Sequence, residues 1–558
     1  MRMQKITCAA LGPSQPLHDV ATTRHIEQRL ASGLPTHTLM QRAGLSVARL
    51  SLALKPHAQC IWIACGPGNN GGDGFEAAMH LHHFGKQVVV TWTGPGKNGL
   101  PPDAQASYER AVAAGVPMAN EPPSDFDVCI DALLGIGVRL GSDKGHADHA
   151  LIERWLGLMQ ASTAIRLAID IPSGLDADTG HFGFENPENL SSPPNATKSI
   201  AASPRKTCRS GLFTLCFLTL KPGLFTVDGR DHAGEVWFDD LGVRALTETA
   251  QEQPCAWLLG ADRIASPQRS KALNASHKGS FGDVAVVGGE STPHSHMAGA
   301  ALLAASAALH AGAGRVFVAL LGVPAMTVDP FQPELMFCSP AALDFKRQIV
   351  VCGCGGGEAV KTILADILSC ATALVLDADA LNAVAQNVHF QASLKARHAR
   401  GLRTVLTPHP LEAARLLGVK TADIQADRLK AATDLAKHFQ AVVVLKGSGT
   451  VIAAPRQTPC INSSGNALLA TAGTGDVLAG MVGAGLANGL NAFDAACNAV
   501  LMHGRLADDW AVSHPLQTLT ASRLAATHRL ERPECPGHTG ASAQHHQADL
   551  QNQNQHQS

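Results

Sequence analysis

The chain has 558 residues, so we expect two or three domains, because a single hydrophobic core rarely grows beyond roughly 250–300 residues. Hydrophobic residues make up 45% of it and charged residues 16%, and the formal net charge is -2 at pH 7, which gives no electrostatic basis for binding nucleic acid or an anionic membrane. The apolar run near the N-terminus is too short for a signal peptide and the 14 cysteines lack framework spacing, so we expect reduced thiols and a cytoplasmic protein.

The first half of the chain alternates segments of helical period with short apolar runs. In chain order, helices are predicted at 36–54 and 74–85, and strands at 59–66, 86–94, 125–137 and 164–174. Short apolar strands separated by helices predict a parallel, doubly wound α/β sheet. Such sheets bind their ligands in the loops at the carboxyl ends of the strands.

Changes in composition divide the chain. Residues of about 181–209 are polar and rich in Pro and Ser, which predicts a surface insertion within a first domain of residues 1–245. A linker at 246–256 leads to a second α/β domain at 257–530, with strands predicted at 282–289, 314–321, 348–353, 373–379, 403–409 and 441–447. The low-complexity tail, 531–558, is predicted to be disordered.

The segment "TAGTGDVLAG" (471–480) carries one carboxylate after two glycines. Gly473 and Gly475 can adopt backbone angles closed to other residues, and the apolar run that follows starts a helix whose N-terminus favours an anion. At the edge of such a phosphate loop, Asp476 would be placed to accept a proton during phosphoryl transfer. The alternative, that Asp476 only caps the helix, is about equally compatible with this segment taken alone.

Three other loops of the second domain follow predicted strands. "VVVLKGSGTVIAAP" (442–455) predicts a short hairpin, with Lys446–Thr450 at its tip, that could hold a nucleotide. His409 stands between two prolines at the end of a strand, before a helix with Glu412 in its first turn. Cys352 and Cys354 are one residue apart and have no second pair, so we interpret them as small residues of a tight loop and not as metal ligands.

These segments carry a family resemblance. "TPHPLE", "KGSGT" and "NALLATAGTGDVLAG", with "HKGSFGDVAVVGG" and "PELM", resemble the ADP-dependent NAD(P)H-hydrate dehydratase branch of the ribokinase-like fold over most of 257–510. The resemblance implies a hydrated nicotinamide dinucleotide as substrate, ADP or ATP as phosphate donor, and Mg²⁺. Asp476 would accept the proton of the ring hydroxyl, and phosphorylation of that hydroxyl would make elimination easy and restore the reduced cofactor.

The same resemblance implies individual contacts. Substrate contacts fall on Ala300, Gly355, His409 and Asp476, and nucleotide contacts on Lys446, Gly447, Ser448, Gly449, Thr450 and Gly475. The chain departs from the family at two places. "VVCGCGGG" stands where the family shows Gly-Pro-Gly, and Leu411 stands where the family has a glycine.

The first domain has oxygen-bearing side chains at its predicted strand ends. "GPGNNGGDG" (66–74) places Asn69, Asn70 and Asp73 in a glycine-rich loop between a strand and a helix, which is a candidate phosphate cradle. Asp131 ends the next strand before a second glycine loop, and Asp170 ends another before Pro172-Ser173-Gly174. One such aspartate is more often a cap or turn residue, but this series of oxygens without Cys or His suits a hard cation.

With "LMQRAG" and "TLCFLTLKPG", these motifs resemble the Rossmann-like NAD(P)H-hydrate epimerase domain. The resemblance implies K⁺ bound by Asn70, Asp131 and Ser173, and Asp170 as acid/base at the substrate. The hydrate would be bound by two loops, formed by Asn69, Asn70, Gly71, Gly72 and Asp73 and by Gly135, Ile136, Gly137, Val138 and Arg139. The family's Ala-Asp-x-Thr segment is replaced here by the polar insertion and "CRSGLFTLCF".

Together the two resemblances predict a bifunctional repair enzyme, an isomerase joined to a lyase. Its first domain would interconvert the R and S hydrates of NADH and NADPH (NADHX and NADPHX), and its second would dehydrate the S form. We expect a homo-oligomer without nucleic-acid or membrane partners. The alternatives are a ribokinase-like kinase for a vitamin precursor, which would accumulate a phosphorylated product, and an N-terminal half that is a non-catalytic binding module.

Overall fold

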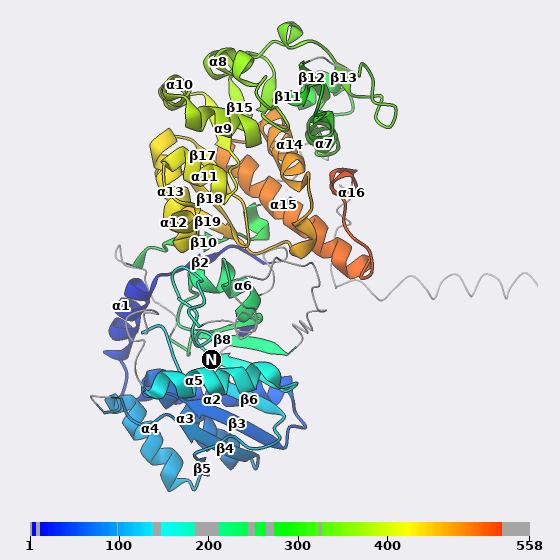
Figure 1. The fold of residues 1–558 in the computed structure, drawn as a ribbon. Coiled ribbons are helices and arrows are strands. Elements are labelled where there is room, and N and C mark those ends of the chain that lie inside the picture. The colour runs from blue at the N-terminus through cyan, green and yellow to red at the C-terminus, as the bar shows by residue number, and fades with distance from the viewer. Residues whose placement is uncertain are drawn as a thin grey trace, which may run out of the picture.

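The computed structural model describes residues 3–6, 12–96, 99–137, 147–184, 211–243, 252–263, 273–322 and 326–526. Figure 1 shows two α/β bodies stacked one on the other, the N-terminal body below and the C-terminal body above. Several sequence predictions lie outside the described residues: those on Val138 and Arg139, on the insertion beyond residue 184, on residues 246–251 of the linker, and on the tail.

An eight-stranded sheet forms the N-terminal body, in the order β1-β9-β8-β7-β6-β3-β4-β5. All neighbours pair in parallel except β1 with β9, which confirms the predicted sheet type. Its strands are β1 Gln4–Lys5, β3 Cys60–Cys65, β4 Gln87–Trp92, β5 Met118–Ala119, β6 Val128–Ala132, β7 Ile165–Ile169, β8 Leu212–Phe217 and β9 Glu235–Asp239. Its helices are α1 Val20–Ala31, α2 Thr38–Leu54, α3 Asn69–His83, α4 Pro102–Ala113, α5 Ala147–Ala161 and α6 Gly229–His232, with the 3-10 turn η2 at Pro222–Phe225.

Strand β3 shows why these strands are apolar along their whole length. Ile61 and Ile63 pack in the core that contains residues of α2 and α3, whereas Trp62 and Ala64 pack in the core that contains Trp155 of α5. Successive strand residues point to opposite faces of a sheet. In a strand covered by helices on both faces, the side chains on both sides are therefore buried, so the strand is apolar along its whole length.

An eleven-stranded sheet forms the C-terminal body, in the order β13-β12-β11-β14-β15-β16-β17-β18-β19-β10-β2. It is parallel from β13 to β17, and β17, β18 and β19 are antiparallel to one another in turn. Its strands are β2 Gln15–Leu17, β10 Ala256–Leu258, β11 Asp283–Ser291, β12 Arg315–Gly322, β13 Met336–Phe337, β14 Ile349–Cys352, β15 Ala373–Leu376, β16 Arg403–Leu406, β17 Val442–Leu445, β18 Thr450–Ala454 and β19 Gln457–Asn462.

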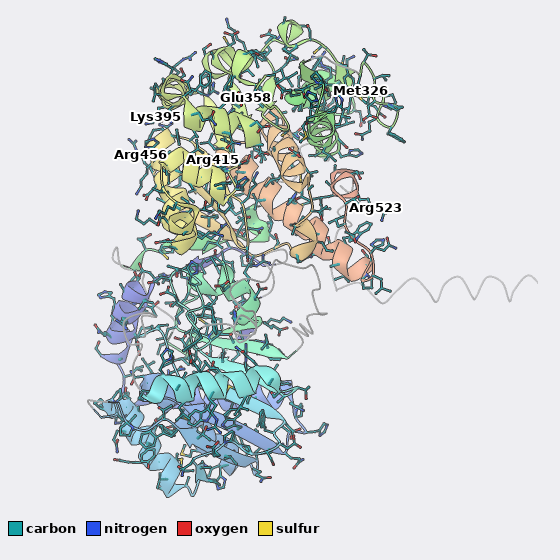
Figure 2. The ribbon with its side chains drawn as sticks, in the orientation of Figure 1. Met326, Glu358, Lys395, Arg415, Arg456 and Arg523 are labelled. Atoms are coloured by element: carbon teal, nitrogen blue, oxygen red, sulfur yellow. The ribbon has the colours of Figure 1, made fainter. Side chains whose placement is uncertain are left out.

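Helices cover this sheet with closely packed small residues. They are α7 Ala298–His310, α8 Lys361–Cys370, α9 Ala378–Gln386, α10 Val388–Ala399, α11 Pro410–Leu417, α12 Thr421–Ala426, α13 Arg428–Phe439, α14 Thr474–Ala487, α15 Ala492–Ser513 and α16 Ala521–Ala526. Helix α14 approaches α7 so closely that a Cβ on Gly480 would lie 2.0 Å from the carbonyl oxygen of Ala304. At the edge of the body, the Arg523 guanidinium of α16 lies over the Trp510 ring of α15, 5.2 Å from its centroid (Figure 2). Among the helices of the described ranges, none has the length and apolar character that crossing a bilayer requires.

Three packed segments correct the predicted boundaries. Strand β2 pairs antiparallel with β10, so a piece of the N-terminal region belongs to the C-terminal sheet. Phe184 is buried and the Phe182 ring stacks on His232 with centroids 4.0 Å apart, so the insertion begins after these aromatic residues and not at residue 181. In the predicted linker, Glu252 is buried in an ion pair with Arg29, and β10 already begins at Ala256.

Candidate functional site

The N-terminal site is a cavity of about 720 Å³ where the loops after β3, β6 and β7 meet. Asn69 is the first residue of α3, where backbone N–H groups favour an anion. The first loop needs its glycines, because a Cβ on Gly71 would lie 2.1 Å from the Gly66 carbonyl oxygen and one on Gly72 would lie 2.6 Å from the Met40 sulfur. Six of the predicted loop residues line the cavity, namely Asn69, Asn70, Asp73, Gly135, Ile136 and Gly137, whereas the predicted Gly71 and Gly72 do not line it.

Asp170 lines this cavity directly after β7. Its φ is 62°, a left-handed conformation uncommon for residues other than glycine. Its Oδ1 accepts hydrogen bonds from Lys221 Nζ at 2.5 Å and from the backbone N–H of Phe217 at 3.0 Å. The Lys221 side chain is 1% exposed; burial lowers its pKa, but Asp170 and Cys216 outweigh burial, so the pKa is raised overall. Lys221 is absent from the predicted site, although a lone lysine in the apolar segment "FLTLKPG" is a signal for it.

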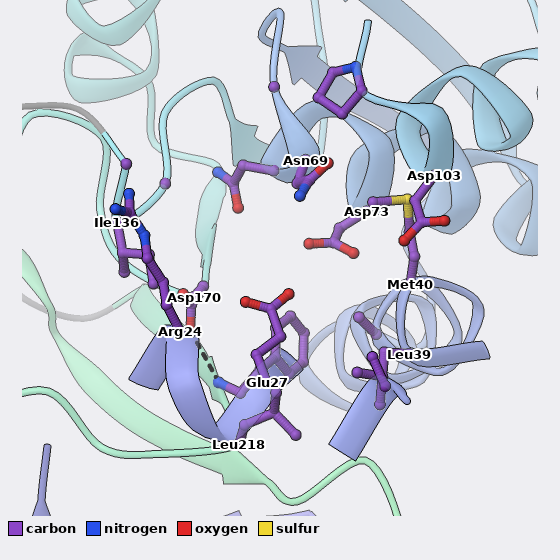
Figure 3. A pocket seen from close by; sticks show the side chains of 18 of the residues that line it. Arg24, Glu27, Leu39, Met40, Asn69, Asp73, Asp103, Ile136, Asp170 and Leu218 are labelled. Atoms are coloured by element: carbon purple, nitrogen blue, oxygen red, sulfur yellow. Dashed lines mark hydrogen bonds between the residues drawn. The ribbon is translucent and has the colours of Figure 1, made fainter. Parts of the chain in front are cut away.

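Two more carboxyl groups share the cavity with Asp170. Glu27 comes from α1 and Asp73 from α3, and Figure 3 shows both side chains pointing into the same space. Burial raises the pKa of both groups. Asp73 is a predicted substrate contact, whereas Glu27 belongs to none of the sequence motifs and could be found only from the packing of α1.

The three predicted cation ligands meet beside the cavity. Ser173 donates to Asp131 twice, from Oγ to Oδ1 at 2.5 Å and from the backbone N–H to Oδ2 at 2.9 Å. Asn70 Nδ2 donates to the Leu134 carbonyl oxygen at 3.0 Å, and that carbonyl also accepts from Ser173 Oγ at 3.3 Å. All three side chains are buried, and burial raises the pKa of Asp131 despite the hydrogen bonds from Ser173. Buried carboxylate, amide, hydroxyl and carbonyl oxygens are a donor set that fits a hard cation.

The C-terminal site lies where β14, β15, β16 and β17, which are neighbours in the sheet, reach their carboxyl ends. Asp476 stands in the first turn of α14, and the cap of that helix is Gly473, with a φ of 90°. The interpretation of Asp476 as the helix cap is therefore wrong. Burial, and after it the nearby Asp377, raises the pKa of Asp476 to about 7.

Asp377 forms hydrogen bonds with residues from two neighbouring strand ends of this site, and it was not predicted from the sequence. Its Oδ1 accepts from Lys446 Nζ at 2.7 Å and from Thr407 Oγ1 at 2.8 Å. Lys446 also stands beside the glycine loop, since a Cβ on Gly475 would lie 3.3 Å from its Nζ. Asp377 follows the strand in "ALVLDAD", the same strand-end pattern that indicates Asp131 and Asp170.

The loop between β14 and α8 is tight, as predicted, with φ angles of 116° at Gly353 and 57° at Gly355. Cys352 is buried in the core. Cys354 is different: one ligand atom each from Cys354, Asp377 and Asp476 lie within 4.8 Å of one another. Burial raises the pKa of the Cys354 thiol, so the thiol stays neutral beside the two carboxyl groups.

The predicted nucleotide loop reaches both bodies. Strands β17 and β18 pair antiparallel, which confirms the hairpin with Lys446–Thr450 at its tip. Ser448 Oγ donates to the Val227 carbonyl oxygen at 3.0 Å, and Thr450 Oγ1 donates to the Gly447 carbonyl oxygen at 3.0 Å. A Cβ on Gly449 would lie 2.3 Å from the carbonyl oxygen of Phe225. One end of the loop thus faces Asp377 and its middle contacts the N-terminal body.

His409 is the N-terminal cap of α11. It was assigned from the sequence to substrate contact, and this structural role was not predicted. Its Nδ1 accepts from the Leu411 N–H at 3.1 Å, and the Glu412 carboxylate accepts from the His409 N–H at 2.8 Å. Burial raises the pKa of Glu412 to about 7. The two remaining predicted substrate contacts lie together, because a Cβ on Gly355 would lie 3.0 Å from the Cβ of Ala300.

Comparison with known proteins covers both bodies. Residues 284–529 match the family model described as NAD(P)H-hydrate dehydratase, and residues 36–197 match the YjeF-related protein N-terminus. The chain is 34% identical over 521 residues to the bifunctional NAD(P)H-hydrate repair enzyme Nnr of Escherichia coli, covering 90% of this chain and 91% of that protein. It is 44% identical over 242 residues to the ADP-dependent (S)-NAD(P)H-hydrate dehydratase of Neisseria meningitidis serogroup B, covering 42% and 78%. A solved ADP/ATP-dependent NAD(P)H-hydrate dehydratase of Bacillus subtilis, co-crystallised with ATP/Mg²⁺, is 30% identical, covers 46% of this chain and 90% of that chain, and has a TM-score of 0.39.

Proposed function

Because the chain belongs to the family of bifunctional NAD(P)H-hydrate repair enzymes, we propose that its two sites act in succession on one damaged cofactor. The N-terminal domain interconverts the R and S hydrates of NADH and NADPH, and the C-terminal domain dehydrates the S hydrate at the expense of a nucleotide. The observation that carries the proposal is that each body holds a cavity-facing or buried aspartate with a matched lysine: Asp170 with Lys221, and Asp377 with Lys446 beside Asp476.

In the epimerase domain, Asp170 is the acid/base group at the substrate. The ion pair with the buried Lys221 fixes its carboxylate at the wall of the cavity that would hold the hydrate. Asn70, Asp131 and Ser173 would hold K⁺, with the Leu134 carbonyl oxygen as a fourth donor that the sequence did not indicate. The ion would supply positive charge next to the substrate loops and offset the burial of Asp131.

In the dehydratase domain, Asp476 is the base that takes the proton of the substrate hydroxyl as phosphate is transferred. A general base works best with a pKa near the working pH, and the value of about 7 for Asp476 meets that condition. The N-terminus of α14, with Gly475, would stabilise the transferred phosphate, and Lys446 with the loop to Thr450 would hold ADP or ATP. Mg²⁺ would be bound mainly by the nucleotide phosphates, since the Cys354 thiol beside Asp377 and Asp476 is not a magnesium ligand.

The remaining assignments follow as proposals from composition and from the nature of the substrates. A near-neutral net charge supports a cytoplasmic enzyme that acts on small molecules and has no nucleic-acid or membrane partner. The homo-oligomer expected from the sequence stays a prediction.

The test is incubation of the purified protein with a mixture of R and S hydrates and either ADP or ATP, following the absorbance of the reduced cofactor. We expect recovery of both hydrates with nucleotide and of neither without it. Accumulation of a phosphorylated product without recovery of absorbance would show a small-molecule kinase instead. Recovery that stops at the S fraction would show that the N-terminal domain is inactive.

A further inference from the structure

The N-terminal cavity contains a carboxyl group that the proposed reaction does not yet use. Glu27 lies on α1, and this helix is fixed at both ends. The Asp178 carboxylate accepts from the backbone N–H of Val20 at 2.8 Å, and Arg29 near the other end binds Glu252 at 2.5 Å. The helix therefore holds Glu27 in the cavity wall, and Figure 3 shows its side chain directed into the cavity beside Asp170 and Asp73.

Two of the basic side chains that line this cavity are paired with acidic ones, and a third, Arg24, lies on the same helix as Glu27. Lys221 is paired with Asp170 at 2.5 Å, and His37 lies 2.5 Å from Asp103. Within the described residues, the Glu27 carboxyl makes no salt bridge and no hydrogen bond. A carboxyl group that is partly buried beside another carboxylate and makes no ion pair retains its proton to higher pH.

Asp73 shares the cavity but is less suited to exchange a proton. Burial raises its pKa well above the ordinary value, and four neighbouring carboxyl groups raise it further. For Glu27, burial and Asp170 raise the pKa, but Lys221 and Arg24 lower it in part. Asp103 adds a small upward effect. Two nearby cations thus oppose the rise in the pKa of Glu27, which favours release of its proton more than at Asp73.

The chemistry of the substrate calls for two such groups. The dihydronicotinamide ring contains an enamine, so hydration places the hydroxyl on the carbon that is bonded to the ring nitrogen. Inversion at this carbon requires the hydroxyl to leave from one face and a water to add to the other. Leaving needs an acid, because hydroxide is a poor leaving group, and addition needs a base.

We propose that Glu27 is the second catalytic residue of the epimerase domain, the acid that works together with Asp170; this rests on the proposed epimerase function. Glu27 gives its proton to the hydroxyl oxygen, the C–O bond breaks with its electron pair leaving as water, and the lone pair of the ring nitrogen forms a C=N bond. A water then adds to the opposite face, Asp170 takes one of its protons, and the C=N electron pair returns to nitrogen. One water enters and one leaves, and exchange with solvent returns the proton. In the S-to-R direction the two residues exchange roles.

The pattern of two carboxyl groups in contrasting surroundings supports this assignment. Asp170 has a lysine at 2.5 Å and Glu27 has none, and environments that separate two carboxyl groups in this way commonly divide them into base and acid. Both groups line one cavity from different elements, α1 and the loop after β7, as a pair of residues that share one substrate must.

The experiment compares Glu27→Gln with wild type, using purified R hydrate and an enzyme-free control for spontaneous epimerisation. We expect the R-to-S rate to fall by at least about 100-fold, the lower range for loss of a general acid. Dehydration of S hydrate by the same preparation should change by less than about twofold, which shows that the variant is folded. In the wild type, kcat/KM for epimerisation should fall at alkaline pH as Glu27 loses its proton, and this alkaline decrease should be absent from the residual activity of the variant. In ¹⁸O-labelled water, each inversion should introduce one labelled oxygen.

Asp73→Asn is the matched control, because it neutralises the other carboxyl group of the cavity. It should raise KM and keep the alkaline decrease. A wild-type rate in Glu27→Gln would overturn the proposal, as would loss of the alkaline decrease in Asp73→Asn while Glu27→Gln retains it. If the S hydrate formed in ¹⁸O-labelled water carried no label, the proposed loss and addition of water would be refuted. If the wild-type rate equals the rate of the enzyme-free control, the domain is not an epimerase, and the proposed role of Glu27 is refuted with it. If the wild type is active and Glu27→Gln is equally active, only the role of Glu27 is refuted.

Discussion

The raised pKa of Asp476 results from its position in the fold. This residue lies partly buried in the first turn of α14, near the carboxylate of Asp377, and a base in this position is neutral for part of the time at neutral pH. Asp476→Asn keeps the shape of the side chain and removes the base. We expect dehydration of the S hydrate to fall by at least about 100-fold and epimerisation to continue unchanged. Near-normal recovery of reduced cofactor by this variant, measured by absorbance with excess nucleotide, would contradict the assignment.

The pH dependence of dehydration follows from the same aspartate. The base acts in its ionised form and its pKa is raised to about 7, so kcat/KM should fall as the pH decreases through about 7. Lys446 lowers the pKa of Asp476. In Lys446→Met the acid limb should therefore move to higher pH, and nucleotide affinity should also weaken. A pH profile with an unmoved limb in Lys446→Met would show that Lys446 does not act on Asp476. The nucleotide KM of the same variant tests its binding role separately.

At the residue scale, sequence patterns found the polar groups that stand in recognisable loops and missed their partners. Asn70, Asp131 and Ser173 follow predicted strands, and the structure brings them within hydrogen-bonding distance of one another or of the shared Leu134 carbonyl. Lys221 lies in the apolar segment "FLTLKPG" and Asp377 at a strand end, but these local signals do not identify the partner of either residue. Their roles arise from pairing with residues 51 and 69 positions away in the sequence, and local patterns do not record such pairing.

At the scale of elements, periodicity identified the parallel strands well because each is a continuous apolar run covered on both faces. It missed β2 and β10. Strand β2 is three residues long and contains Pro16, and it pairs with a strand about 240 positions later in the chain. Proline is tolerated there because β2 is at the edge of the sheet. A short edge strand of this kind is stabilised by the strand it pairs with, so its own sequence gives little indication that it forms a strand.

The insertion makes a prediction at this scale. Residues 185–209 contain Pro, Ser and Asn in place of the apolar residues that would offset the entropy of ordering. Limited proteolysis should cut first within 185–209, and dehydration should survive the cut. His181 Nε2 donates a hydrogen bond to the Gln425 carbonyl oxygen at 2.6 Å, so cleavage at 181–184 should be slower. First cuts within the strands of either sheet would contradict the prediction.

The hairpin loop offers a second prediction for an element. Gly449 has a φ of 66°, and any Cβ there would meet the backbone of Phe225 and Thr226. Gly449→Val should therefore both strain the loop and separate it from the N-terminal body, and we expect a lower melting temperature together with weaker nucleotide binding. Gly418→Val serves as the control: Gly418 has a φ of 69°, but a Cβ there meets no atom within 4 Å. If the melting temperature and nucleotide binding decrease equally in both variants, backbone strain alone explains the effect.

For the whole molecule, the notable feature is that one segment of the N-terminal domain serves both sites. Lys221 binds Asp170, and six residues later Val227 donates its N–H to the Ser448 carbonyl oxygen at 3.2 Å. Arg230 then donates to the carbonyl oxygens of Ser463 and Gly465 at 2.7 and 2.6 Å. These contacts connect the segment that pairs with Asp170 to the loop 446–450, which is proposed to hold the nucleotide, and to the segment 463–465 that precedes α14. They also give a physical reason for the fusion of the two domains in one chain.

The last prediction tests this connection through Arg230. Hydrogen bonds from a charged donor contribute roughly 1.5–3 kcal/mol each, and Arg230→Ala leaves two carbonyl oxygens of the loop before "TAGTGD" without that donor. We expect the nucleotide KM of dehydration to rise several-fold, with epimerisation of R hydrate little changed, since Arg230 lies outside the epimerase cavity. Arg415→Ala is the control, because Arg415 bonds to Asn382 within the C-terminal body (2.7 Å). Its exposed side chain is labelled in Figure 2. If Arg230→Ala and Arg415→Ala have the same nucleotide KM as wild type, the contact between the domains supports only their packing, and the two sites work independently.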